Sequence, residues 1–258
     1  NGITNLRWIE LDKCSNLTSI TIGNGITGIG GYEFSGCTNL ESITLGDGIT
    51  FISSEAFSRC SGLESIKVSE KNSKYDSRNN CNAIIETDTN TLIQGSSTTI
   101  IPDDVTSIGD HAFSDIANLK SITISENITN IGEGVFSGCV DLTDIKVSEK
   151  NSKYDSRNNC NAIIETDTNT LIQGCSTTII PDDVTTIEEG AFFSLDKLTS
   201  IRIPKSVTSI KNYAFFVCDN LTTINYTGTQ EEWNKITIEE DGNDILKSDT
   251  VTINYNYK

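Results

Sequence analysis

The most regular feature of the chain is a recurring pattern of apolar and polar positions. In a clear copy, the alternation Ile201-Arg202-Ile203 is followed by a turn, then by Val207-Thr208-Ser209-Ile210 and by Ala214-Phe215-Phe216-Val217-Cys218. Strict alternation places every second side chain on one face, which predicts a β-strand with one buried face. In the second segment the inward residues are three apart, which predicts a bent or 3₁₀-like path rather than a long helix. Because the pattern recurs, we predict a repeat protein.

The strand-like pairs are spaced regularly along the chain. Consecutive pairs are 23 residues apart, apart from two steps of 33. The pairs are Ile20/Ile22, Ile43/Leu45, Ile66/Val68, Thr99/Ile101, Ile122/Ile124, Ile145/Val147, Thr178/Ile180, Ile201/Ile203 and Ile224/Tyr226. A single coil of this size cannot bury its apolar face, so neighbouring coils are expected to share one core. We predict a parallel β-ladder of about nine coils, with a spine formed by Phe57, Phe113, Phe136, Phe192 and Phe215.

Two long coils, residues 69–101 and 148–180, are predicted to carry hairpins. Residues 66–108 and 145–187 match except at Ser96/Cys175 and Ser107/Thr186. Inside the first copy, two β-prone runs at 83–86 and 91–95 flank the polar segment 87–90. That arrangement predicts a β-hairpin. We expect each long coil to replace its far side with a protruding hairpin.

The two ends of the chain depart from the repeat. Residues 2–14 align with residues 25–37 as a half-repeat without its strand. Residues 227–258 are interpreted as a C-terminal cap, because an open solenoid end would leave an exposed strand edge. Thr229 is predicted to be the N-cap of a short helix. Residues 1–226 and the cap are expected to form one domain.

Composition narrows the possible partners. The formal net charge of -17 and the pI near 4.3 argue against nucleic acid, which needs a basic surface, and against docking on anionic membranes. No run of about 18 apolar residues occurs, so no membrane insertion is expected. The chain begins at Asn1 and contains no Met, which indicates a processed or truncated piece whose signal peptide, if any, precedes Asn1. We expect a monomer.

Several motifs resemble a known family. The runs are Asn80-Cys81-Asn82-Ala83-Ile84-Ile85-Glu86-Thr87, Asn90-Thr91-Leu92-Ile93, Ile101-Pro102-Asp103-Asp104-Val105-Thr106-Ser107-Ile108-Gly109 with Ala112-Phe113, and the tail Tyr226-Thr227-Gly228-Thr229-Gln230-Glu231-Glu232-Trp233. They are similar to the BspA-like (Treponema-type) leucine-rich repeat proteins over essentially all of residues 2–258. The resemblance implies a leucine-rich repeat solenoid, an α/β-class horseshoe that is mostly β, on an extracellular or cell-surface bacterial protein. It also implies adhesion to host glycoproteins or other cells. The chain departs from the pattern at Glu10-Leu11 and Tyr32-Glu33-Phe34, where Ala-Phe is expected.

No catalytic residue, cofactor site or metal site is predicted. The single histidine, His111, occupies a repeat position that elsewhere holds Tyr32, Glu55, Gly134, Gly190 and Tyr213, so we expect an exposed side chain without a catalytic role. Cys14, Cys37, Cys60, Cys139 and Cys218 share a position with Ile116 and Leu195, which predicts free thiols in the core. A Cys160–Cys175 disulfide remains open. The acidic segments 239–244 and 88–90 do not fit a calcium-binding loop pattern.

The outward face of the predicted ladder is the candidate binding surface. One column reads Thr21, Thr44, Lys67, Ile100, Thr123, Lys146, Ile179, Arg202 and Asn225. The neighbouring column consists of Ser and Thr with one acid, Asp144. We predict a non-enzymatic module that binds a protein or glycoprotein through Thr21, Thr44, Lys67, Thr123, Lys146, Arg202 and Asn225, with a contribution from the hairpin tips 88–90 and 167–169. Two alternatives stay open: Ser and Thr are there because they suit strands, or the chain is a passive structural spacer of a larger surface protein.

Overall fold

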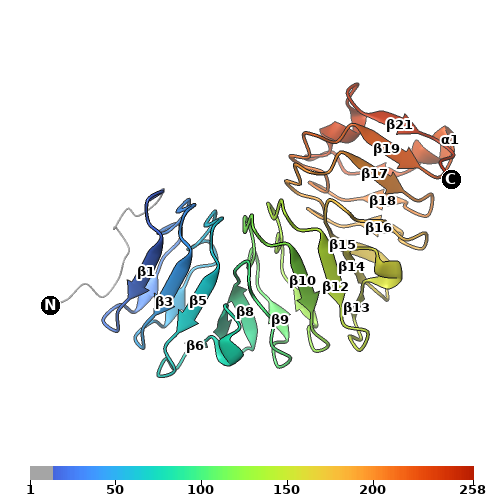
Figure 1. The fold of residues 1–258 in the computed structure, drawn as a ribbon. Helices are drawn as coiled ribbons and strands as arrows, with labels where there is room; N and C mark the ends of the chain where they lie inside the picture. The colour runs from blue at the N-terminus through green and yellow to red at the C-terminus, as the bar shows by residue number, and fades with distance from the viewer. Residues whose placement is uncertain (1–13) are drawn as a thin grey trace. The chain divides into compact units, whose positions relative to one another are not determined.

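The computed structural model describes residues 14–258, which fold as a mostly-β parallel solenoid of about nine turns (Figure 1). The predicted leucine-rich repeat fold is therefore confirmed. Most coils carry a four-residue strand on one side, the near side. These strands are β1 (Ser19–Ile22), β3 (Ser42–Leu45), β5 (Ser65–Val68), β10 (Ser121–Ile124), β12 (Asp144–Val147), β17 (Ser200–Ile203) and β19 (Thr223–Tyr226).

The chain divides into two compact units. Unit 1 contains the described residues up to Leu119 together with Asn127–Cys139, and unit 2 contains Lys120–Glu126 and Val140–Lys258. Each unit has its own near-side ladder, and each is described separately below. That residues 1–226 and the cap form one domain stays a prediction.

The near-side strands pair in parallel at the spacing of the repeat. In unit 1, Ile20, Ile43 and Ile66 lie in register along β1, β3 and β5. In unit 2, β10 pairs with β12, and β17 pairs with β19. The inward residues of the alternation are buried, as with Ile43 and Ile66. Burial of these apolar side chains between neighbouring coils is the main reason why such short strands form a stable ladder.

The far side also forms a ladder, which differs from the predicted 3₁₀-like path. Two-residue strands form where the Thr-x-Ile positions of adjacent coils meet. They are β2 (Gly28–Ile29), β4 (Phe51–Ile52), β9 (Ser107–Ile108), β11 (Asn130–Ile131), β16 (Thr186–Ile187), β18 (Ser209–Ile210) and β20 (Thr237–Ile238). The physical reason is pairing between coils: the Ile29 carbonyl, for example, accepts a hydrogen bond from the Ser53 N–H at 3.0 Å.

The phenylalanine spine is confirmed, but it is divided into stacked pairs. The ring centroids are 5.4 Å apart for Phe34 and Phe57, 5.2 Å for Phe113 and Phe136, and 5.0 Å for Phe192 and Phe215. The hairpin coils interrupt the stack because they contribute glycine there instead of phenylalanine. Gly95 lies directly against the ring of Phe113, and a Cβ at this position would clash with that ring.

The hairpins form as predicted, but they do not protrude. In unit 1, β7 (Ile84–Glu86) pairs antiparallel with β8 (Thr91–Gln94), and β6 (Tyr75–Asp76) adds a third strand. β8 then pairs in parallel with the far-side strand β9. Ile84, Ile85 and Leu92 are fully buried, so the hairpin completes the core. Unit 2 repeats this arrangement with β13 (Tyr154–Asp155), β14 (Ala162–Glu165) and β15 (Thr170–Gly174).

The strands predicted at 99–101 and 178–180 do not form. In unit 1 the Ile100 N–H donates to the Cys81 carbonyl at 3.1 Å, and in unit 2 the Ile179 N–H donates to the Cys160 carbonyl at 3.0 Å. In both coils the N–H group is therefore bonded within its own hairpin coil and not to the strand of a neighbouring coil. The short 3₁₀ helices Arg78–Asn80 and Arg157–Asn159 lead into these contacts.

The C-terminal segment both continues the ladders and closes them. Thr229 is the N-cap of α1 (Gln230–Trp233), as predicted, and forms a capping box with Glu232. Trp233 is buried, with its ring 5.2 Å from that of Tyr226. After the 3₁₀ helix Asp244–Lys247, β21 (Thr252–Asn254) pairs with β19. The predicted half-repeat at 2–14 lies, apart from Cys14, outside the described residues. Among the described residues, no helix has the length and apolar character that crossing a membrane requires.

Candidate functional site

The first three candidate residues form one row on unit 1. Thr21, Thr44 and Lys67 are direct register partners on β1, β3 and β5. All three side chains are exposed, because the alternation directs them away from the core. The next position of the column, Ile100, lies in the hairpin coil, where 76% of its surface is exposed.

The remaining candidates form rows on unit 2. Thr123 pairs with Lys146, and Arg202 pairs with Asn225, whose next partner is Asn254 on β21. Thr123 and Lys146 are exposed, whereas Arg202 and Asn225 are half-buried. Ile179, which corresponds to Ile100, has 62% of its surface exposed. The structure therefore groups the predicted residues by unit, and whether they bind a ligand stays a prediction.

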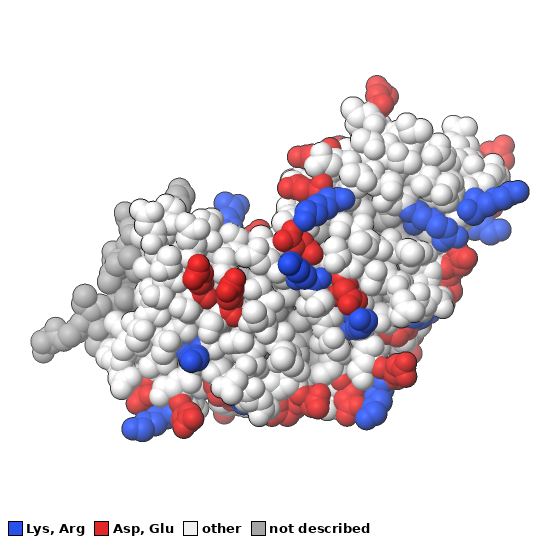
Figure 2. All heavy atoms as spheres, viewed as in Figure 1, with Lys and Arg blue, Asp and Glu red and all other residues white. Residues whose placement is uncertain are grey.

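Acidic neighbours offset much of the positive charge predicted for this face. The ammonium group of Lys146 lies 2.8 Å from Asp144, and the guanidinium group of Arg202 lies 2.7 Å from Asp182. Lys67, in contrast, forms no ion pair with the residues that the structure describes. On the face shown in Figure 2, acidic as well as basic side chains lie among uncharged ones over β3 and β5. The rows are thus hydroxyl-rich and close to neutral rather than basic.

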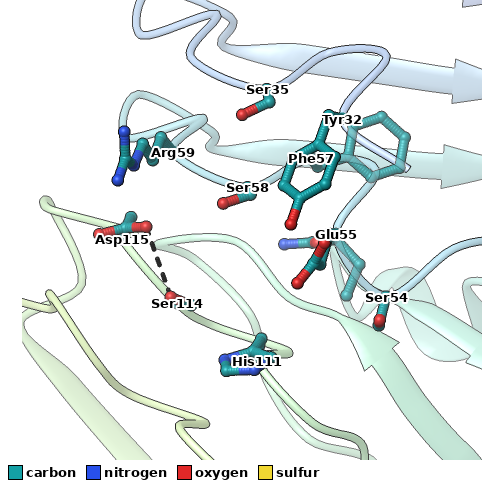
Figure 3. Close-up of a pocket in the computed structure, with 11 residues that line it drawn as sticks. Tyr32, Ser35, Ser54, Glu55, Phe57, Ser58, Arg59, His111, Ser114 and Asp115 are labelled. Carbon is teal, nitrogen blue, oxygen red and sulfur yellow. Dashed lines mark hydrogen bonds between the residues drawn. The ribbon is translucent and has the colours of Figure 1, made fainter.

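A second feature, which the sequence analysis did not predict, is a polar pocket of about 380 Å³ in unit 1. Figure 3 shows Tyr32, Glu55 and Arg59 on one side of it and His111, Ser114 and Asp115 facing them. These residues belong to the turns that follow the far-side strands of three coils. The pocket is lined further by Ser35, Ser54, Phe57, Ser58 and Gln94.

The pocket combines hydrogen-bonding groups with both signs of charge. The hydroxyl of Tyr32 bonds to Glu55, and this bond raises the pKa of Tyr32. Burial raises the pKa of the Asp115 carboxyl group, whereas the positive charge of Arg59 and the hydroxyl of Ser114 oppose that rise. The Ser114 hydroxyl lies 3.4 Å from Asp115 Oδ2.

The cysteines behave as core residues. Cys60, Cys139 and Cys218 are buried free thiols, as predicted, Cys37 is also buried, and Cys14 is half-buried. Burial raises the pKa of Cys60 to about 12 and that of Cys218 to about 11, so these thiols stay protonated near neutral pH and are poor nucleophiles. Cys160 and Cys175 are also free in this structure, so the disulfide left open by the sequence is not formed here.

The other candidates lie in ordinary surface environments. His111 is exposed, as predicted, although it lies at the edge of the pocket. At the first hairpin tip, Asp88 lies 3.6 Å from the ammonium group of Lys74. Glu239 forms an ion pair with Lys211 at 2.9 Å. Within residues 14–258 no group of three or more metal-binding side chains occurs.

No specific signal in the sequence marks the pocket. The repeat position of His111 takes either glycine or a side-chain-bearing residue, and the structure shows why. At this position the backbone is left-handed, with φ of 65° at Tyr32, 56° at His111 and 56° at Gly134. Tyr213 occupies the same repeat position with φ of 57° but does not line the pocket, so the left-handed turn belongs to the repeat and does not by itself predict the pocket.

Comparison with known proteins identifies the repeat. A sequence model described as a BspA type leucine rich repeat region matches residues 9–94, 94–173 and 171–239. No curated protein matches the sequence.

Several solved structures are similar to this chain. A leucine-rich cell surface protein from Faecalibacterium prausnitzii is 26% identical with a TM-score of 0.52, covering 88% of this chain and 64% of its own. A leucine-rich repeat protein from Eubacterium ventriosum is 22% identical with a TM-score of 0.49, covering 81% of this chain and 60% of its own. The pneumococcal vaccine antigen PcpA is 17% identical with a TM-score of 0.48, covering 94% and 67%. The chain thus spans less than two thirds of the first two proteins.

Proposed function

We propose that this chain, which belongs to the family of BspA-type leucine-rich repeats, is a non-enzymatic binding module of a secreted or surface-attached bacterial protein. Its ligand is a protein or glycoprotein, and it contacts the outward face of the near-side strands. The family and the cell-surface description of the Faecalibacterium relative support the location. Adhesion to host glycoproteins or to other cells is the role that this location favours.

The observation that carries the proposal is the exposure of one isoleucine in the hairpin coil of each unit, at a position of the outward column. Ile100 and Ile179 are 76% and 62% exposed, so they contribute little to the core. They occupy matching positions in two coils of nearly identical sequence. Each isoleucine supplies the kind of apolar contact that the buried core of a protein interface contains.

The proposal is tested by a binding screen of the chain against arrays of host matrix proteins and glycans at physiological salt. For any saturable hit, the variants Ile100→Ser and Ile179→Ser are compared with Thr44→Glu/Lys67→Glu in unit 1 and Thr123→Glu/Lys146→Glu in unit 2. We expect the affinity to fall at least about tenfold in the variants of the unit that binds, because central contacts of an interface each contribute about 1–2 kcal/mol or more. All substituted side chains are exposed, so the melting temperature is expected to stay within a few degrees.

Matched controls carry the same charge change elsewhere. Thr50→Glu/Lys71→Glu in unit 1 and Lys205→Glu/Thr208→Glu in unit 2 alter exposed residues away from the strand rows. They are expected to bind like the parent chain. If the controls lost binding to the same extent, the loss would be an effect of net charge alone. If no protein or glycan of the array bound the chain, the structural spacer would be favoured.

A further inference from the structure

The pocket in unit 1 exists because the hairpin coil omits a turn. In a regular coil, residues 109–120 lead from the far-side strand β9 toward the next near-side strand and include the Ala112-Phe113 turn. In the hairpin coil only residues 93–97 make the corresponding connection after Leu92, the register partner of Ile108. The Gly95 N–H donates to the Ala112 carbonyl at 2.7 Å, which holds this short connection against the next coil. The turns on either side are left facing each other across the cavity.

Four residues at the pocket adopt a backbone conformation that favours glycine. Tyr32, Arg59, His111 and Asp115 have φ of 65°, 59°, 56° and 61°. The next coil shows that glycine fits both positions of this turn, since Gly134 and Gly138 have φ of 56° and 70°. Side chains held in a left-handed conformation are unfavourable for folding. The matching turn positions of unit 2 share it, with φ of 57° at Ser194, 57° at Tyr213 and 55° at Val217. It is therefore a property of the repeat, and the proposal rests on the cavity and the side chains that line it.

We propose that this pocket binds one residue of an uncharged saccharide. The cavity volume of about 380 Å³ lies within the range of roughly 300–1,000 Å³ that small-molecule sites occupy. Carboxylates, hydroxyls and a guanidinium group supply acceptors and donors together, which suits a ligand whose neighbouring hydroxyls both donate and accept. Tyr32, 56% exposed at the rim, offers a flat apolar face for the C–H face of a sugar ring.

The charges of the lining decide between ligand classes. Glu55 and Asp115 carry two carboxyl groups against the single guanidinium group of Arg59. This balance disfavours phosphates and acidic sugars. Arg59 in turn donates hydrogen bonds to sugar hydroxyls and offsets the attraction that the carboxylates would exert on cations. Glu55 and Asp115 lie on opposite sides of the pocket (Figure 3), so that both can accept hydrogen bonds from hydroxyl groups of one sugar ring.

This site is separate from the strand face, and the inference stands without it. The pocket residues lie in turns, whereas Thr44 and Lys67 lie on β3 and β5. Substitutions in one site are therefore expected to leave binding at the other unchanged, so that the failure of either proposal can be recognised by itself.

The test is a titration of the full chain with methyl glycosides of glucose, galactose, mannose and N-acetylglucosamine, followed by NMR or calorimetry. Glucosamine and glucuronate serve as the cationic and anionic comparison ligands. We expect at least one neutral glycoside to bind at millimolar concentration or better. Tyr32→Gly and Asp115→Gly are expected to weaken it at least tenfold. Because both changes relieve a left-handed conformation, the melting temperature should be unchanged or higher by about 2–4 °C.

Ser194→Gly is the matched control. Ser194 has φ of 57° at the position of unit 2 that corresponds to Asp115, but it does not line the pocket. This variant is expected to gain stability in the same way and to keep full saccharide binding. The proposal is overturned if no neutral glycoside binds, if glucosamine or glucuronate binds in preference to all of them, or if binding survives in both Tyr32→Gly and Asp115→Gly.

Discussion

Ser96 and Cys175 occupy the same position in the two hairpin coils and differ in how well they are hydrogen-bonded. The Ser96 hydroxyl lies 2.9 Å from the Asn82 carbonyl and 3.1 Å from the Glu64 carbonyl. The Cys175 thiol lies 3.4 Å from the Asn161 carbonyl, and a thiol is the weaker donor. Both side chains are fully buried. The duplication therefore offers a controlled comparison of one hydroxyl with one thiol in the same surroundings.

We expect Cys175→Ser to leave the free energy of unfolding unchanged or to raise it by up to about 1 kcal/mol, the usual net contribution of one hydrogen bond. Ser96→Cys should lower it by a similar amount. Urea denaturation under reducing conditions measures both. A disulfide to Cys160 would reverse the first result under oxidising conditions, because closing a loop of about 15 residues stabilises by roughly 3 kcal/mol. Intact-mass analysis with and without reductant detects that bond directly.

At the scale of the element, each hairpin is fixed by one arginine. Arg78 donates from Nε to Asp76 at 2.9 Å and from Nη1 to Asn90 at 3.0 Å, and it also binds Asp104. It thereby joins the end of β6, the residue before β8 and the loop before β9. Its ion-pairing partners raise the pKa of Arg78 further, although burial opposes this. Arg157 makes the corresponding contacts in unit 2.

Lysine cannot reproduce this planar, forked set of bonds. We expect Arg78→Lys to destabilise the first hairpin by about 1–3 kcal/mol, because the partly buried partners Asp76 and Asn90 lose a charged donor. Hydrogen exchange followed by mass spectrometry checks this. Peptides that include Ser96 report on the first hairpin, and peptides that include Cys175 report on the second. Faster exchange in both hairpins, or in neither, would contradict a local role for Arg78, and Arg157→Lys should give the mirror result.

The elements that were predicted correctly are those that a local pattern determines. The alternation of Ile43 and Leu45 is sufficient to place β3, and the two β-prone runs around the polar segment 87–90 are sufficient to place β7 and β8. The strand expected at 99–101 failed because a non-local partner, the Cys81 carbonyl, takes the Ile100 N–H. β6 was missed because Tyr75-Asp76 is too short to show a period of its own.

The same division applies to the candidate sites. Thr44 and Lys67 could be placed in one row because a repeat of 23 residues sets the register directly. The ion pair between Arg202 and Asp182 could not be predicted, because Asp182 lies in the loop before β16, in the coil that precedes that of Arg202. The pocket depends on a turn that is absent from the hairpin coil, and this absence could be recognised only once the structure paired Leu92 with Ile108.

At the scale of the whole molecule, burial of free thiols is repeated along the chain. Burial raises the pKa of Cys60 to about 12 and those of Cys160 and Cys218 to about 11, from an ordinary value of 9.0. The thiols of Cys81 and Cys139 are shifted in the same direction for the same reason. These groups remain protonated in the folded chain at a pH where the unfolded chain has begun to release its protons. The net charge of -17 adds a self-repulsion that is not specific to any residue.

This linkage predicts a loss of stability at alkaline pH. Below the unfolded pKa of about 9 the thiols have no effect on the pH dependence, and between pH 9 and the folded values of 11 to 12 each adds up to about 1.4 kcal/mol per pH unit to the fall in the free energy of unfolding. Urea midpoints between pH 8 and pH 10 with reductant measure the slope. Tyrosine and lysine also begin to titrate in this range, so the share of a thiol is taken from the difference between the parent chain and a cysteine variant. The variant Cys60→Ala should reduce this slope by up to about 1.4 kcal/mol per pH unit, the contribution of one titrating thiol.

Salt distinguishes thiol ionisation from the self-repulsion of the net charge. A concentration of 0.5 M NaCl screens repulsion between exposed charges but leaves the ionisation of buried thiols unchanged. A slope that vanished in salt, or that was the same in Cys60→Ala, would assign the alkaline loss to net charge rather than to the thiols.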